Sequence, residues 1–84
     1  MESAALNNNL YLVKDLSRLS GLSVYTVKYY LKLGLIREIG RSPETNFRYF
    51  NNSTVDSLKR IIGLRKEKVS LNKIRYLMDE KGSS

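Results

Sequence analysis

Tyrosine and lysine side chains gather on one face of a short helix that the sequence predicts over residues 24–33. Residues three and four positions apart lie on the same side of a helix. The side chains that share this face are those of Tyr25, Lys28, Tyr29 and Lys32. Cations between flat polar rings suit the major groove of DNA, where a helix fits and its first residues reach base edges. We therefore interpret this face as a candidate surface for reading duplex DNA.

The beginning of the same helix is a candidate site for a phosphate oxygen. Ser23 is placed to cap the helix, because its hydroxyl can accept a backbone N–H that has no partner in the first turn. The remaining N–H groups of that turn, together with Ser23 and Thr26, can bind an anion. Core packing is the alternative for Tyr29 and Tyr30, and the Tyr30 ring can pack there while its hydroxyl reaches a phosphate.

The composition argues against most other kinds of chemistry. The 84 residues contain neither Cys nor His, which removes thiolate and imidazole metal sites, thiol nucleophiles and His-based triads. No carboxylate pair is placed for acid–base work, and the phosphate-binding pattern GxxxxGK[ST] does not occur. We therefore expect no enzyme activity, no cofactor and no metal. No apolar run approaches the ~18 residues of a membrane-spanning helix.

The net charge of +7 indicates a polyanionic partner. Residues 18–66 carry ten basic and three acidic side chains, so the whole excess of positive charge falls within this segment. A basic chain can also bind a membrane surface, usually through one long amphipathic helix. Here the basic and apolar residues are spread over several short elements, which disfavours a membrane partner.

A helix-turn-helix pattern occupies the first half of the chain. Apolar residues recur at helical spacing from Val13 onward, and Gly21 ends this first helix. The second helix follows Ser23 and ends at Gly34, a residue type that favours the backbone conformation after a helix. Its inward stripe is expected to comprise Val24, Val27 and Leu31. Two short helices joined by a turn that contains glycine form a helix-turn-helix unit.

The second half predicts a hairpin followed by two more helices. Residues 35–50 hold turn-forming Gly, Pro and Asn between two short runs of strand formers, which is typical of a hairpin, or wing. Asn51 or Asn52 can cap a helix that runs to about Lys68, and Ser70 can cap a last helix to about Glu80. The expected fold is mostly α, a winged helix-turn-helix over residues 11–80. Residues 1–10 are expected to be a flexible arm, and residues 81–84 a disordered tail.

Five segments in series resemble the N-terminal DNA-binding domain of the MerR family of bacterial transcription regulators. They are residues 11–23 (YLVKDLSRLSGLS), 26–30 (TVKYY), 33–36 (LGLI), 46–50 (NFRYF) and 64–71 (LRKEKVSL). The resemblance covers about residues 11–79, with the segments in the family's order and spacing. The chain departs from the family pattern at Lys28 (usually Arg), Leu31 (usually acidic), Phe47 (usually Tyr) and Lys68 (usually Gly).

The resemblance implies further contacts with DNA. Arginine can bind a phosphate through two parallel hydrogen bonds or enter a narrowed minor groove. In the family, the positions of Arg41, Phe47 and Arg48 contact the DNA backbone from the first wing. Arg65 matches a phosphate-contacting position beside a second wing, which is the joint between the third and fourth helices. Without the hydroxyl of the family's tyrosine, Phe47 can pack on a sugar but cannot donate a hydrogen bond.

The resemblance also implies partners and a setting. The expected partner is double-stranded promoter or operator DNA in the bacterial cytoplasm (nucleoid), with RNA polymerase engaged indirectly through the distorted promoter. A homodimer would form through a C-terminal helix that is missing from this chain. One alternative is a short architectural DNA-binding factor, such as an excisionase or recombination directionality factor, which the lack of an effector domain favours. The close match of both wings favours the regulator. A protein-interaction module is the alternative outside DNA binding.

Overall fold

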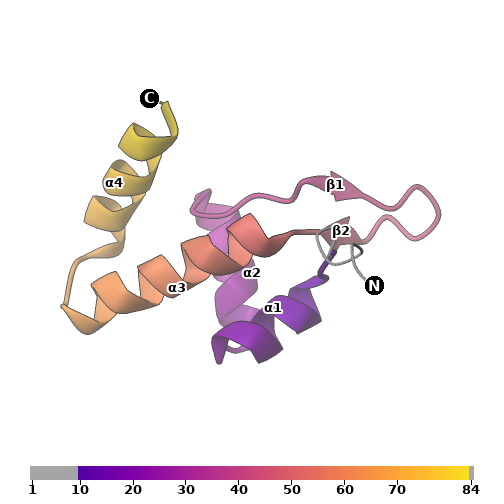
Figure 1. Ribbon diagram of the computed structural model, residues 1–84, viewed down its shortest axis with the longest axis horizontal. Helices are drawn as coiled ribbons and strands as arrows, with labels where there is room; N and C mark the ends of the chain where they lie inside the picture. The colour runs from indigo at the N-terminus through magenta and orange to yellow at the C-terminus, as the bar shows by residue number, and fades with distance from the viewer. Residues whose placement is uncertain (1–9, 84) are drawn as a thin grey trace, which may run out of the picture.

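The computed structural model describes residues 10–83, and its helices and hairpin follow the predicted order (Figure 1). The elements are α1 (Val13–Ser20), α2 (Val24–Leu33), β1 (Gly40–Arg41), β2 (Arg48–Tyr49), α3 (Asn52–Lys66) and α4 (Leu71–Ser83). The predicted fold class, a mostly α winged helix-turn-helix, is confirmed. Most of the expected N-terminal arm, residues 1–9, lies outside the described residues. Among the described helices, none is long and apolar enough to cross a membrane.

Side-chain caps begin three of the helices at the predicted residues. The Ser23 hydroxyl accepts the backbone N–H of Thr26 at 3.0 Å, and the Ser70 hydroxyl accepts that of Lys73 at 3.1 Å. Asn51 caps α3, which leaves Asn52 as the first residue of that helix. Each cap satisfies a backbone donor that the first helical turn leaves without a partner. The boundaries of α2, α3 and α4 therefore follow from single polar residues.

A residue in the left-handed backbone conformation follows each of α1, α2 and α3. Gly21 and Gly34 adopt φ values of 81° and 82° after α1 and α2, as expected for glycine at this position. Lys68 adopts φ 65° in the turn between α3 and α4, so this turn keeps its left-handed residue although the family's glycine is absent. The last helix continues to Ser83, past the end expected near Glu80. The expected tail is corrected accordingly, because residues 81–83 lie in α4 and only Ser84 falls outside the described residues.

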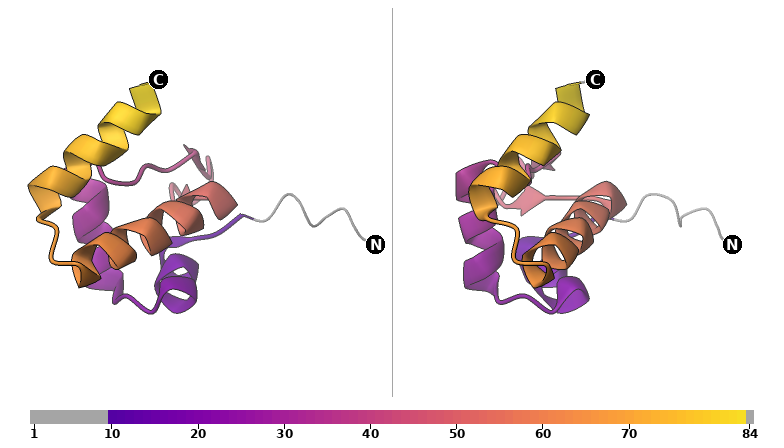
Figure 2. Two further views of the ribbon diagram at one scale, coloured as in Figure 1. Left: turned by 60° about the vertical axis from the view of Figure 1, so that its left-hand side comes forward. Right: turned by 90° about the vertical axis from the view of Figure 1, so that its left-hand side faces the viewer.

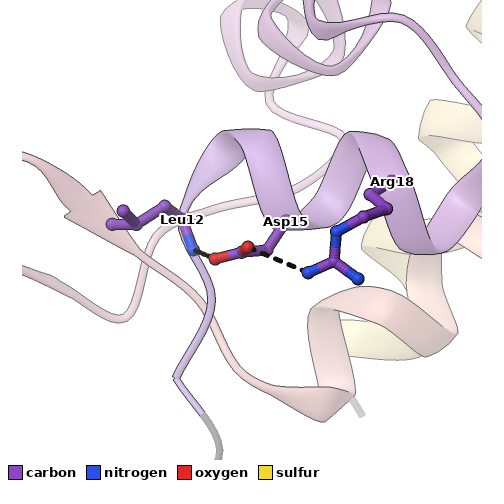
Figure 3. Close-up of polar contacts among 3 residues, drawn as sticks. All are labelled: Leu12, Asp15 and Arg18. Atoms are coloured by element: carbon purple, nitrogen blue, oxygen red, sulfur yellow. Dashed lines mark hydrogen bonds and ion pairs between the residues drawn. The ribbon is translucent and has the colours of Figure 1, made fainter.

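The first helix begins with a contact that the sequence analysis did not anticipate. The Asp15 carboxylate accepts the backbone N–H of Leu12 at 2.9 Å, and its other oxygen accepts a hydrogen bond from Arg18 at 3.1 Å (Figure 3). The Leu12 N–H in particular, and then the Arg18 guanidinium, lower the pKa of Asp15 below its ordinary value of 3.8. An acid in the first turn also interacts favourably with the positive end of the helix dipole.

Replacing Asp15 with alanine is expected to destabilise the domain by about 1 kcal/mol at neutral pH, the usual value of a side-chain cap. Because the folded state lowers the pKa of Asp15, the stabilisation is present above the pKa of the unfolded chain. It is lost as the pH falls through the lower pKa of the folded state. Urea unfolding of both proteins at pH 7 and at about pH 2 should therefore show a difference that shrinks in acid. A difference that stays constant with pH would contradict this role of the carboxylate.

The hairpin is short and closely packed. Gly40 pairs with Tyr49, and Arg41 pairs with Arg48, in an antiparallel register. A Cβ atom on Gly40 would lie 2.5 Å from the Tyr49 hydroxyl oxygen, so the tyrosine side chain needs glycine at this position. Asn46 closes the turn with φ 63°, a conformation that asparagine tolerates well. The two arginines are thereby held opposite each other on neighbouring strands.

A backbone bridge ties the beginning of the described chain to the end of the hairpin. Tyr11 and Phe50 exchange two backbone hydrogen bonds of 2.8 and 2.7 Å. The Tyr11 hydroxyl also donates to the side-chain oxygen of Asn52 at 2.7 Å. This bridge sets α1 beside the wing, an arrangement that local sequence patterns did not predict.

One apolar core lies between α1, α2, α3, α4 and the segments that flank the hairpin. Its buried residues are Leu16, Val27, Tyr30, Leu35, Ile36, Phe50, Val55, Leu58, Ile61 and Ile74. The α1 helix packs against α2 and α3, while α4 packs against the end of α3. The hairpin and α4 lie at opposite ends of the long axis (Figure 1), and α4 rises away from α1 in both views of Figure 2. The helix-turn-helix lies between these two ends.

Val24 departs from the predicted inward stripe of α2. Val24 is 40% exposed, so only Val27 and Leu31 of the expected stripe pack inward. Leu19 of α1 is also exposed. Val24 is the first residue of α2, where the chain has just turned at Ser23, and its side chain faces the hairpin side of the molecule. The periodic pattern therefore failed at the helix terminus, where the neighbouring element determines what is covered.

Candidate nucleic-acid interface

The tyrosine–lysine face of α2 points outward. Tyr25 is 78% exposed, and Lys28, Tyr29 and Lys32 are exposed as well. Tyr30 is only 7% exposed and belongs to the core, with its ring centroid 6.3 Å from that of Tyr29. Of the interpretations left open for Tyr30, packing of its ring is the one observed. The outward face thus carries two exposed tyrosines and two exposed lysines.

The two hydroxyl groups at the beginning of α2 form hydrogen bonds within the helix cap. The Ser23 hydroxyl accepts the Thr26 N–H and donates to the Thr26 hydroxyl oxygen, both at 3.0 Å. Ser23 is exposed and Thr26 is half-buried. The N–H groups of Val24 and Tyr25 precede the first intrahelical donor, which is the Val27 N–H bonded to the Ser23 carbonyl, and therefore point toward the space before the helix. An anion at this end would meet those two groups and the positive end of the helix dipole.

The two wing arginines share one carboxylate. The Arg41 Nε donates to Glu38 Oε2 at 3.4 Å, and the Arg48 Nε lies 3.6 Å from Glu38 Oε1. Both arginine side chains are 43% exposed. The Glu38 backbone N–H in particular, and then the two guanidiniums, lower the pKa of the Glu38 carboxyl below its ordinary 4.5. Glu38 is therefore ionised at neutral pH and offsets part of the positive charge of the wing.

An open cleft of about 570 Å³ lies between the wing and the first two helices. Its cationic lining comes from α1, α2 and both strands of the hairpin, and comprises Lys14, Lys28, Arg41 and Arg48. Its apolar lining comprises Leu12, Val13, Val24 and Phe47. The wing, the beginning of α1, and Val24 and Lys28 of α2 thus open onto the same space. The lining of this cleft thus combines apolar and cationic side chains.

Tertiary structure adds two residues that the sequence analysis did not propose. Lys14 lies on the first turn of α1 and lines the cleft opposite the wing. Glu38 precedes β1 and joins the two arginines. A lone lysine on a helix and an acid before a strand are common on any surface, so neither residue type nor local spacing could identify them. The exposed Val24 is explained by the same cleft, because its side chain forms part of the apolar lining.

Arg65 lies apart from this cleft. Its guanidinium donates to the backbone carbonyl of Val69 at 2.9 Å and so bridges the turn between α3 and α4. The side chain remains exposed at that turn. This end of α3 lies on the side of the helix-turn-helix opposite the hairpin tip (Figure 1). Arg65 is therefore a candidate for a second, separate contact and has a local structural role as well.

Comparison with known proteins shows which family this chain belongs to. The sequence profile of the MerR HTH family of regulatory proteins matches residues 11–81. The chain belongs to this family. The residues that carried the resemblance in the sequence, from Tyr11 to the α3–α4 turn, all fall within the matched range. No curated protein sequence shows significant similarity to the chain.

Two solved structures of the same family share the fold. One is HiNmlR, a MerR family regulator lacking the sensor domain, bound to promoter DNA. The similarity to it has a TM-score of 0.78 and 25% sequence identity, and it covers 87% of this chain and 55% of that protein. The other is a MerR family transcriptional regulator from Bacillus cereus, with a TM-score of 0.77, 17% identity, and coverage of 83% of this chain and 52% of that one. The chain spans about half the length of the structures that it matches.

Proposed function

We propose that this chain binds double-stranded DNA and forms the DNA-reading domain of a bacterial MerR-type transcription regulator. The observation that carries the proposal is the cleft, where Lys28 of α2 and both wing arginines face one space. Membership in the MerR family and the promoter-bound HiNmlR structure support the same conclusion. In this role α2 enters the major groove, while the wing lies along the phosphate backbone.

The contacts divide into two kinds. Tyr25, Lys28 and Tyr29 are the candidates for base edges, because they lie on the first two turns of the exposed face of α2. Contacts to the backbone would come from both wing arginines, from Phe47 on a sugar, and from Lys14 across the cleft. Arg65 would contact a phosphate from the turn between α3 and α4. Contacts of the second kind set position and affinity, and those of the first kind set sequence preference.

A salt titration tests the proposed function. Each phosphate neutralised by a cation releases counterions, which adds about −0.9 to the slope of log K against log salt concentration. The four cations proposed to contact the backbone are Lys14, Arg41, Arg48 and Arg65, and they predict a slope of about −3 to −4 on an unrelated duplex. Fluorescence anisotropy with a labelled duplex measures this slope directly. Failure to bind any duplex at about 50 mM salt would contradict the proposal.

Tyr25→Ala is expected to reduce binding to the preferred sequence more than binding to unrelated DNA. A contact to a base edge contributes about 1–3 kcal/mol of discrimination, whereas unrelated DNA is held mainly through its phosphates. Lys28→Ala should behave in the same way. The preferred duplex can be obtained by selection from a random library, and Tyr76→Ala, an exposed tyrosine on α4, is the matched control. Equal losses on both duplexes would indicate contacts to the backbone instead.

The same proposal assigns the chain a binding role without catalysis, in the bacterial cytoplasm. Promoter or operator DNA would be its direct partner, and RNA polymerase would be engaged indirectly. A homodimer would place two copies of α2 on two half-sites about one helical turn apart, or a multiple of that distance. Cross-linking of the protein on a duplex with two half-sites would test that arrangement.

A further inference from the structure

We propose that Glu38 limits the affinity of the wing for DNA, by holding one negative charge between the two arginines that contact the phosphates. The inference rests on the proposed function, since it concerns the same wing. It assigns a role to a residue that does not itself contact DNA favourably. Its consequence is that the natural chain binds every duplex more weakly than its wing arginines would allow.

The Glu38 carboxylate is shared between the guanidinium groups of Arg41 and Arg48. Arg41 and Arg48 are partners across the hairpin, where like charges directly opposite each other repel. The two Glu38 oxygens approach one Nε atom each, at 3.4 and 3.6 Å. No other described carboxylate makes an ion pair with either arginine. The three side chains together carry a net charge of one, whereas the arginines alone would carry two.

A DNA phosphate would approach these same guanidiniums and thereby come close to the Glu38 carboxylate. Two negative charges near the same pair of cations repel each other, and their repulsion opposes binding. Every duplex presents phosphates in the same way, so the penalty is independent of base sequence. The carboxylate stays charged at neutral pH, because its own backbone N–H and the arginines lower its pKa. The repulsion between Glu38 and the phosphate therefore opposes DNA binding at neutral pH.

The same geometry shows why the hairpin does not depend on this carboxylate. Exposed ion pairs at these distances contribute little to folding stability. The hairpin is held instead by its backbone pairing, by the Tyr49 side chain over Gly40, and by the bridge between Tyr11 and Phe50. A Glu38→Gln variant keeps the shape of the side chain and one acceptor oxygen, and it removes the negative charge. Such a variant is expected to fold normally.

The test compares Glu38→Gln with the natural chain on a preferred and an unrelated duplex. We expect binding to both duplexes to tighten by about three- to tenfold, which corresponds to removing one nearby like charge in a mostly aqueous setting. The salt slope should steepen by up to about one unit, since more counterions are displaced when the wing is fully cationic. Thermal unfolding provides the check that the variant is folded.

Two control variants separate the contact from a general effect of charge. Glu44→Gln removes the same charge from the turn of the same hairpin, where no ion pair to a described residue is formed, and should tighten binding less. In a chain that already carries Arg41→Ala and Arg48→Ala, adding Glu38→Gln should have little further effect. If Glu38 acted only on the stability of the hairpin, Glu38→Gln would change DNA binding to the same extent with and without the two arginines.

Several outcomes would overturn the inference. Weaker binding by Glu38→Gln would mean that the carboxylate positions the arginines, and equal effects of Glu38→Gln and Glu44→Gln would mean that the contact is irrelevant. A change confined to one sequence would show that Glu38 acts on base recognition. If the natural chain binds DNA with a steep salt slope and Glu38→Gln changes nothing, only this inference fails. If the natural chain binds no duplex at all, the proposed function fails.

Discussion

Arg48→Ala is expected to weaken binding to every duplex by about tenfold and to flatten the salt slope by about one unit. A hydrogen bond to a charged group contributes about 1.5–3 kcal/mol, and the lower end applies to a side chain that is 43% exposed. A loss of about 1.5 kcal/mol corresponds to about a tenfold change in the dissociation constant. Anisotropy titrations at several salt concentrations would measure both quantities on the same samples.

The shared carboxylate strengthens this expectation. Without Arg48, the Glu38 carboxylate would pair with Arg41 alone, and the wing would lose most of its remaining positive charge. The loss should therefore be similar on preferred and unrelated sequences, because it acts on phosphates. Arg75→Ala on α4 removes the same charge at a distance from the cleft and serves as the control. Unchanged affinity and slope would contradict the role of Arg48, and a loss restricted to one sequence would indicate a base contact.

Phe50→Ala is expected to destabilise the fold by about 3–5 kcal/mol. Phe50 is fully buried, and its backbone forms the bridge to Tyr11. Its ring therefore lies where the end of the hairpin, the beginning of α1 and the core meet. Small domains have total stabilities near the lower end of about 5–15 kcal/mol, so this loss would leave a substantial unfolded population. Urea unfolding followed by far-UV circular dichroism measures the change.

Phe47→Ala is a matched control for this prediction. The same substitution three residues earlier removes a ring that is 59% exposed, so stability should change by no more than about 0.5 kcal/mol. Phe47 lines the cleft, and its loss should instead weaken binding to DNA. The two substitutions should therefore separate folding from binding. A loss below about 1 kcal/mol for Phe50→Ala would show that the core tolerates the cavity.

The helix boundaries could be predicted because each depends on one or two neighbouring residues. Ser23, Asn51 and Ser70 cap helices through bonds that span two or three residues. Gly21 and Gly34 end helices because glycine adopts a positive φ without steric cost. Such short-range interactions are visible in the order of residues. The exposed face of α2 followed in the same way from helical spacing.

One error lies where distant segments meet. Val24 was expected in the core but borders the cleft, because its surroundings are set by the hairpin rather than by α2. At that position the surrounding fold overrides a local preference. The last helix was expected to end near Glu80 but reaches Ser83, although glycine at position 82 has a low helix propensity. Lys68 takes a left-handed conformation that favours glycine.

The sequence by itself determined the elements, their order, the positive charge and the outward face of α2. These properties depend on residue type and on spacings within one element. Only the tertiary structure brought Lys14 to the cleft, set Arg41 opposite Arg48 and placed Glu38 between them. Those contacts depend on strand register and on the bridge between Tyr11 and Phe50, which joins residues far apart in the chain. The sequence thus determined which groups could meet DNA, and packing decided which of them act together.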